Sequence, residues 1–339
     1  MRNPARANLP IDRCPRYFIL WFAALFFGLP ASGLIIDAGD GSGNTMPPDP
    51  DWGWANVGTR SGGTCSVVYL GNRWVITAAH VGAGITEFDG VQYQPVAHSP
   101  MHLKNPDGSK ADLVLFRLST DPPLPKLTLG ARSPRPGQAV TLVGLGSTRG
   151  GAITIDSEAG LIDGFMWATP GTRRWGSNQV AGPVGPVQHG DAYTLAFPMI
   201  FEAIGTPGST DQEAAAAHGD SGGAVFALAD ALQPEKGYAL VGIIFSVSNR
   251  PGAPPRSSLY GSATFAADIA LYRDQILDIT HLDCPENTLS SAYEEGRCEP
   301  QHATTPAELD GLQFALIMSP LALLTGLILI IRRRCATRQ

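Results

Sequence analysis

Short apolar stretches, separated by glycine, proline and polar residues, fill the middle of this chain. Stretches of this kind that are rich in Val, Ile, Leu and aromatic residues are typical of β-strands, and clusters of turn residues separate one strand from the next. We predict strands at residues 64–70, 74–77, 92–96, 113–118, 139–144, 193–197 and 238–245. Asp89 and Gly90 stand between two apolar stretches and predict a hairpin turn, because glycine readily takes a positive φ. The pattern indicates an all-β protein.

One segment near the end of this region has the period of a helix. Residues 266–279 place three large apolar side chains at i, i+3 and i+7, with charged residues between them. Farther upstream, residues 121–137 are rich in proline, which cannot donate a hydrogen bond to a β-ladder. We therefore predict a C-terminal helix, and a connector that divides the strands into two halves at about residues 36–120 and 137–265.

The N-terminal end has the order of a secretory signal peptide. Four arginines precede the apolar residues 17–29, and the small residues 31–33 follow. An uncleaved N-terminal anchor is the alternative, but the apolar run is short for a spanning helix. We expect residues 1–33 to be removed.

The C-terminal end predicts a membrane anchor. Residues 314–331 carry no charge, and three arginines follow at 332–334. As a helix this run is about 27 Å long, close to the thickness of a bilayer. We predict a transmembrane helix at 312–331 and a basic cytoplasmic tail at 332–339, with the bulk of the chain outside. The polar residues 281–311 would form a stalk. The alternatives are a buried core helix and a removable bacterial sorting tail.

The exported part of the chain is strongly acidic. Eight of the 24 basic residues are arginines of the two ends, so residues 34–331 hold 16 basic and 29 acidic residues. Such a balance repels phosphate backbones and anionic lipid surfaces, and we expect no nucleic-acid partner.

Three short motifs carry the candidate chemistry. Residues 218–223 read HGDSGG, residues 77–80 read TAAH, and Asp112 opens the apolar strand 113–118. In the order His, Asp, Ser these motifs resemble the active-site segments of the trypsin/chymotrypsin-like serine peptidases, the S1 family. Each motif alone has an ordinary structural explanation, but all three in this order within an exported all-β chain favour catalysis.

The resemblance assigns a role to each residue. A serine hydroxyl needs a neighbouring base to take its proton as it attacks an amide, so Ser221 would be the nucleophile and His80 the base. Asp112 would hold the other ring nitrogen of His80, as in the well-known triad. The backbone N–H groups of Gly219 and Ser221 would bind the oxyanion, and Gly219 would permit the required turn. We interpret His98, His102, His189 and His218 as surface or loop residues.

The resemblance also implies a fold and a pocket. Residues 34–280 would form two six-stranded antiparallel β-barrels with the active site between them, followed by the helix. Ala215 would lie at the base of the primary specificity pocket, and Ser246 in the segment that forms its far wall. Because an Asp at the position of Ala215 would select Lys or Arg, its absence predicts no preference for a basic side chain.

The resemblance also implies a partner for Asp220. In relatives the Asp before the nucleophile pairs with an N-terminal amine released by cleavage, and removal of the signal peptide could release such an amine at Leu34.

The cysteines predict one disulfide and one free thiol. Cys284 and Cys298 bracket a short polar segment and are the natural disulfide pair in an oxidising compartment. Cys65 would then be a buried free thiol, since the resemblance places its usual partner at Val81.

The sequence thus predicts a secreted or membrane-tethered serine endopeptidase that acts on proteins or peptides through an acyl-enzyme. We expect no cofactor, and the scattered histidines give no support for a metal site. A non-catalytic binding or adhesion module on the same fold, and an esterase-like acyl hydrolase, remain as alternatives.

Overall fold

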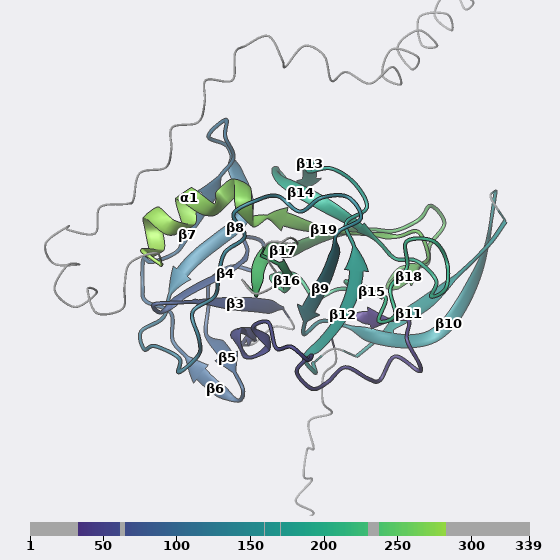
Figure 1. Ribbon diagram of the computed structural model, residues 1–339, viewed down its shortest axis with the longest axis horizontal. Helices are drawn as coiled ribbons and strands as arrows, with labels where there is room; N and C mark the ends of the chain where they lie inside the picture. Colours follow the sequence, from purple (N-terminus) through teal and green to yellow (C-terminus); the bar gives the residue numbers. More distant parts are fainter. Residues whose placement is uncertain (1–32, 62–64, 159, 170, 230–236, 283–339) are drawn as a thin grey trace, which may run out of the picture.

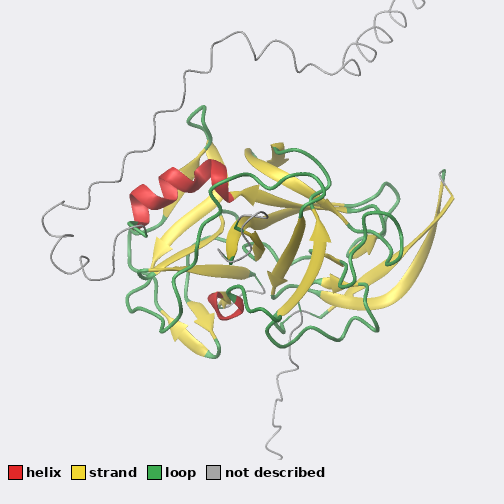
Figure 2. Ribbon diagram, viewed as in Figure 1, coloured by secondary structure: helices red, strands yellow, loops and turns green. Residues whose placement is uncertain are grey.

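The computed structural model describes residues 33–61, 65–158, 160–169, 171–229 and 237–282. Strands are its main regular structure, with one α-helix near its C-terminal end (Figure 2), and so the prediction of an all-β protein is confirmed. Cys284, Cys298 and the segments predicted as signal peptide, stalk and membrane helix lie outside the described residues, apart from Gly33, His281 and Leu282 at their edges. No helix in the described part is long and apolar enough to cross a membrane.

Two seven-stranded antiparallel sheets contain most of the strands (Figure 1). In order across the first sheet, the strands are β6 (Val91–Tyr93), β5 (Thr86–Phe88), β2 (Val57–Arg60), β3 (Ser66–Gly71), β4 (Trp74–Ala78), β8 (Lys110–Arg117) and β7 (Met101–Lys104). In order across the second sheet, they are β12 (Arg174–Gln179), β9 (Ala139–Gly144), β16 (Ala224–Leu228), β17 (Tyr238–Ser248), β19 (Ala263–Asp268), β14 (Ala192–Ile200) and β13 (Gly185–His189). The proline-rich residues 121–137 lead from β8 of the first sheet to β9 of the second.

Two smaller sheets and a short helix complete the strand-rich part. The long hairpin of β10 (Thr148–Ser157) and β11 (Gly160–Ala168) extends away from the second sheet and pairs with β18 (Ser257–Leu259). Near the N-terminus, β1 (Ile35–Ile36) pairs with β15 (Ala214–Ala215), and a 3-10 helix, η1, covers Trp54–Asn56.

The strand count differs from the expected two six-stranded barrels. Each sheet has seven strands, and the ladders among the described residues leave both sheets open. Single bridges, Pro95 to Leu118 and Val180 to Met199, nevertheless link distant parts of each sheet. Proline has no N–H to extend a ladder, so the contact at Pro95 stays a single bridge. Each sheet therefore curls back on itself without closing.

The two sheets share one of the apolar clusters of the core. Side chains of the first sheet, such as Ile76 and Leu115, pack in the same cluster as Phe226 and Ile243 of the second, and all four are fully buried or nearly so. Burying a side chain of this size contributes about 1.5–3 kcal/mol. Because this cluster contains side chains of both sheets, it holds the sheets, and the loops at their ends, against each other.

The predicted helix forms as α1 (Ile269–Thr280), a few residues later than the sequence indicated. The Asp268 side chain caps it by accepting a hydrogen bond from Ala270 N at 3.0 Å. On its buried face, the Tyr272 hydroxyl donates to Asn105 Oδ1 at 2.7 Å and accepts from Leu195 N at 2.9 Å. The helix thus ties the β7–β8 loop to β14.

The predicted Asp89-Gly90 turn is confirmed. Both residues have positive φ, 47° for Asp89 and 81° for Gly90, and they join β5 to β6 in register. Two positive φ values match the right-handed twist of a two-residue hairpin.

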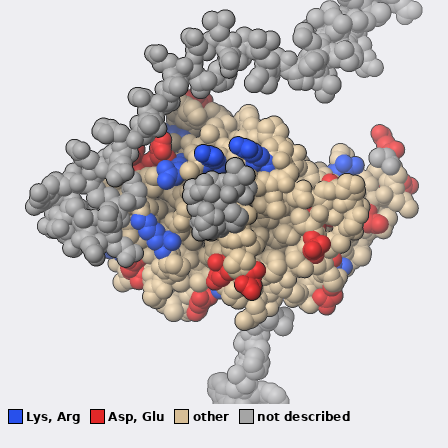
Figure 3. Space-filling model, viewed as in Figure 1, with Lys and Arg blue, Asp and Glu red and all other residues tan. Residues whose placement is uncertain are grey.

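Charged side chains are unevenly spread over the surface. On the face shown in Figure 3, the basic side chains gather above the middle of the molecule, and the acidic ones gather below it and toward the β10–β11 arm. Most of this face carries neither charge.

Glu213 is a buried acidic group that holds the segment leading into β15. Its side chain is fully buried, and it accepts hydrogen bonds from Asn178 Nδ2, Glu202 N, Thr210 N and Thr210 Oγ1 at 2.9–3.1 Å. Burial nevertheless raises the pKa of Glu213 to about 7, because desolvation penalises the charged form more than these donors favour it.

We predict that Glu213 makes stability depend on pH. Between its ordinary pKa of 4.5 and about 7, the folded state holds a proton that the unfolded state has lost. The resulting stabilisation is present in full at acidic pH, falls as the pH rises through about 7, and amounts to on the order of 3 kcal/mol. Thermal unfolding of Glu213→Gln between pH 5 and 8 should therefore give a flatter profile than the wild type. Glu158→Gln, on the exposed arm, should retain the wild-type slope, and equal slopes for all three proteins would refute the assignment.

Candidate active site

The end of β4 and the start of β8 bring His80 and Asp112 together. The two strands pair so that Ala78 lies opposite Leu113, and Ala79 N donates to the Asp112 carbonyl at 3.1 Å. Asp112 N in turn donates to Thr194 Oγ1 of β14 at 2.8 Å, which fixes the start of β8 against the second sheet. Both residues are therefore placed by backbone pairing within strands that are almost entirely buried.

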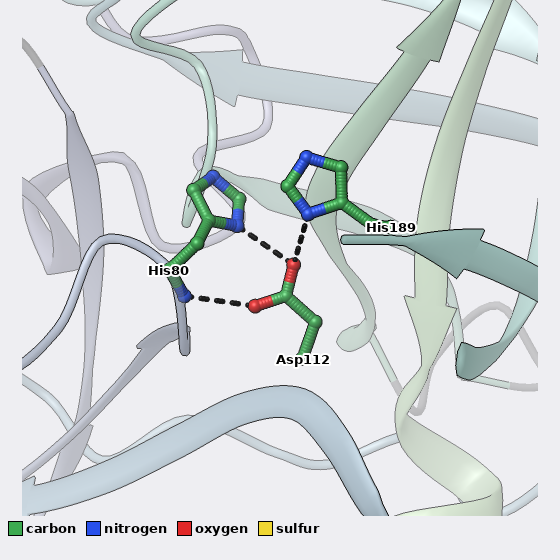
Figure 4. Close-up of side chains that lie close together, drawn as sticks. All are labelled: His80, Asp112 and His189. Atoms are coloured by element: carbon green, nitrogen blue, oxygen red, sulfur yellow. Dashed lines mark hydrogen bonds and ion pairs between the residues drawn. The ribbon is translucent and has the colours of Figure 1, made fainter. Parts of the chain in front are cut away.

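The Asp112 carboxylate holds His80 at two points (Figure 4). Its Oδ2 lies 2.7 Å from His80 Nδ1, and its Oδ1 accepts the backbone N–H of His80 at 2.8 Å. An ionised carboxylate can only accept hydrogen bonds, so the ring proton of a neutral His80 is on Nδ1. Nε2 then carries a lone pair. The Asp112 side chain is 4% exposed and that of His80 is 33% exposed, so the ring is supported from the inside and open to solvent outside.

His189 is a third member of this group; its side chain is partly exposed, as expected for a surface residue, but the sequence did not indicate its contact with Asp112. It ends β13, and its Nδ1 lies 2.9 Å from the same Oδ2 of Asp112. The rings of His80 and His189 lie with their centroids 4.5 Å apart, and the edge of the His189 ring meets Phe245. No sequence motif marks His189, because only the packing of β13 and β14 against the start of β8 brings it to Asp112.

The predicted nucleophile loop is built around two glycines with positive φ. Gly219 has φ 96° and Gly222 has φ 85°. A Cβ on Gly222 would lie 1.9 Å from the Ser66 carbonyl oxygen and 2.1 Å from Thr77 Oγ1, so only glycine fits there. Ser66 N also donates to the Ser221 carbonyl at 2.9 Å. The loop is thus seated on β3 and on Thr77, three residues before His80.

Ser221 itself is half-buried. The hydrogen bonds found among the described residues do not join its side chain to His80. In the loop, the N–H groups of Asp220, Gly222 and Gly223 donate to backbone carbonyls, whereas those of Gly219 and Ser221 have no acceptor in the described part of the chain. Two neighbouring N–H groups without a partner are the arrangement that an oxyanion site requires.

Asp220 is buried beneath this loop and contacts the N-terminal segment. It is fully buried and accepts hydrogen bonds from Gly146 N and Ala217 N, both at 2.8 Å, and from Leu34 N at 3.3 Å. With only neutral donors around it, burial raises the pKa of Asp220 to about 7. The contact places the backbone nitrogen of Leu34 where the sequence predicted an amine.

The residues expected to shape the specificity pocket lie apart from this network. Ala215 is 3% exposed on β15, opposite Ile35, in an apolar cluster with Phe201. Ser246 is half-buried on β17, where the register with β19 shifts by one residue. No interaction found among the described residues joins Ala215 to Ser246 or either of them to His80.

Part of the chain matches a known protein family. Residues 42–158 match the family model described as Trypsin, a stretch that contains His80 and Asp112 and ends before Ser221. The predicted family resemblance is confirmed. No curated protein matches the chain.

Solved structures of trypsin-like proteases also match. One is mouse brain neuropsin, a serine protease, with 18% identity and a TM-score of 0.45 over 70% of this chain and 98% of that one. Another is the active form of the Rv3671c protease from M. tuberculosis, with 15% identity and a TM-score of 0.38 over 63% of this chain and 73% of that one.

Other residues discussed in the sequence analysis agree with the expectations to different degrees. Cys65 is a free thiol, as predicted, but it is only half-buried, and burial raises its pKa. His98, His102 and His218 are exposed, in agreement with their interpretation as surface residues.

We predict that Gly222→Ala destabilises the folded domain. The added Cβ would collide with the Ser66 carbonyl in a backbone conformation that alanine rarely adopts, at a cost of about 2 kcal/mol or more. This corresponds to a loss of roughly 4 °C or more in Tm for a domain of this size. Gly151→Ala is the control, since nothing lies within 4 Å of its Cβ. If both variants melted like the wild type, the seating of the loop would be wrong.

Proposed function

We propose that the chain is a serine endopeptidase in which His80, Asp112 and Ser221 form the catalytic triad. The proposal depends most on one observation: Asp112 holds His80 through both Nδ1 and the backbone N–H, beside a loop whose glycines are constrained to carry Ser221. The confirmed family resemblance supports a peptidase, and hence a protein or peptide substrate.

The proposed reaction follows the chemistry of a serine, a histidine and an aspartate acting together. As the Ser221 hydroxyl attacks the peptide carbonyl, its proton passes to His80 Nε2, and Asp112 stabilises the imidazolium that forms. The carbonyl oxygen becomes an oxyanion, which the N–H groups of Gly219 and Ser221 bind; one such donor contributes about 3 kcal/mol to transition-state stabilisation. His80 then returns the proton to the leaving amine, leaving an acyl-enzyme. A water molecule, deprotonated by His80, hydrolyses that ester and restores Ser221.

The proposal also covers the substrate specificity and the cellular location of the enzyme. The family resemblance implies a pocket with Ala215 at its base and Ser246 on its far wall, and without an acidic residue at its base such a pocket would favour a small or uncharged side chain over Lys or Arg. The signal-peptide pattern of residues 1–33 and the apolar run at 314–331 support export and tethering to the membrane, with the catalytic domain outside the cytoplasm. The acidic exported part argues against a nucleic-acid partner.

We expect an active-site-directed organophosphonate to label the wild-type chain on Ser221 and to leave Ser221→Ala unlabelled. Mass spectrometry of the intact protein and of its peptides would locate the adduct, and circular dichroism would show that both proteins are folded. Casein and peptide-library hydrolysis should follow the same pattern. A folded wild type without labelling would favour a binding module, and labelling with ester but no peptide hydrolysis would favour an esterase.

We further predict that the N-terminus at Leu34 activates the enzyme. A free ammonium group at Leu34 would face the buried Asp220 carboxylate, where the uncleaved chain offers only a neutral N–H at 3.3 Å. A charged partner favours the ionised carboxylate and holds the oxyanion loop. A chain that starts at Leu34 should exceed one that starts at Gly33 by at least about tenfold in kcat/KM, which is about 1.4 kcal/mol.

Asp220→Asn is the matched control for this comparison. It keeps the size of the side chain and removes its charge, so the advantage of the Leu34 N-terminus should disappear in that variant. Equal activity of the two N-termini with Asp220 intact would show that the loop does not depend on the amine.

A further inference from the structure

We propose that His80, Asp112 and His189 form a binding site for a divalent transition-metal ion such as Zn²⁺, and that the bound ion switches the enzyme off. The metal site is defined by side chains on this chain alone. The inhibition, but not the binding, rests on the proposed peptidase function.

The three side chains converge on one point (Figure 4). His80 Nδ1 and His189 Nδ1 lie 2.7 Å and 2.9 Å from the same Oδ2 of Asp112, and all three potential ligand atoms lie within 4.8 Å of one another. Zinc binds imidazole nitrogen and carboxylate oxygen at about 2.0–2.2 Å, so shifts of about half an ångström would bring all three atoms to one ion.

The donor set selects the class of metal. Two imidazoles and one carboxylate suit zinc and its first-row neighbours, and three protein ligands leave a further position open for water. Calcium and magnesium prefer sets of oxygen ligands, which this group does not provide.

Metal binding would not require either histidine ring to release a proton to solvent. In the metal-free site, both neutral rings carry their proton on Nδ1, because both donate to a carboxylate that can only accept. When the ion takes the Nδ1 lone pairs, each ring keeps its proton on Nε2 instead. Asp112 Oδ2 changes from acceptor to ligand, while Oδ1 still accepts the His80 N–H.

The site is reachable and its surroundings favour a cation. A pocket of about 600 Å³ is lined by all three residues. The side chains of His80 and His189 are 33% and 39% exposed, whereas Asp112 is 4% exposed, so the ion would sit between open rings and a buried charge. Lys110 and Asp191, which also line the pocket, offset each other in charge. The acidic balance of the exported part adds a general attraction for cations.

Occupation would disable the base. His80 with its proton on Nε2 cannot accept the proton of Ser221, and Asp112, now a metal ligand, can no longer stabilise an imidazolium. The ion would act as a reversible inhibitor that a chelator removes.

Binding is tested by calorimetry with Zn²⁺ on the full chain in detergent, in the Ser221→Ala background so that self-cleavage does not interfere. We expect one Zn²⁺ per chain, no comparable binding of Ca²⁺, and binding at least about tenfold weaker in His189→Asn. Asparagine can place its amide nitrogen near the position of Nδ1 and so can still donate to Asp112. His102→Ala, an exposed histidine that lines the same pocket, should bind as tightly as the parent.

Inhibition is tested on the active chain and on His189→Asn by peptide hydrolysis with added Zn²⁺ and then a chelator. We expect inhibition that the chelator reverses, and a half-inhibiting concentration at least tenfold higher in His189→Asn. Equal Zn²⁺ binding by parent and His189→Asn, or loss of binding in His102→Ala alone, would overturn the site. Binding without inhibition of an active chain would overturn the regulatory role. A chain that binds Zn²⁺ but never hydrolyses peptides would refute the proposed function and leave the site intact.

Discussion

The candidate site depends on the hydrogen bonds that the Asp112 carboxylate accepts. It is almost fully buried, yet it accepts three N–H groups: two from His80 at the end of β4 and one from His189 at the end of β13. A buried charge is costly unless donors surround it, and here the donors come from both sheets. The carboxylate therefore fixes the orientation of the ring and the relation of the sheets at the same point.

Local patterns predicted the parts of the structure that local chemistry controls. The helix at Ile269–Thr280 follows from its apolar spacing and its Asp268 cap, and the Asp89-Gly90 hairpin follows from the positive φ of its residues. The contact between His80 and Asp112 could also be predicted, because the sequence resembles a family in which these two motifs meet. In each case the residues that carry the signal are the residues that form the feature.

Features that arise from packing across the molecule could not be predicted in this way. His189 has no motif, since it reaches Asp112 only because β13 pairs with β14, and Thr194 of β14 binds Asp112 N. The curl of each sheet also depends on distant pairs, such as Pro95 with Leu118, whose geometry no local pattern encodes. The sequence around Glu213 did not indicate that its side chain would be buried and would accept four hydrogen bonds.

The contact between Leu34 and Asp220 also sets an order of events during synthesis. The two residues are 186 positions apart, so the N-terminal strand has no partner until most of the domain has been made. At about 5–20 residues per second, that delay is roughly ten to forty seconds. Until then β1 lacks its partner β15, and the loop that carries Ser221 lacks its contact with Leu34. The contact therefore forms late in folding, after most of the domain has been synthesised.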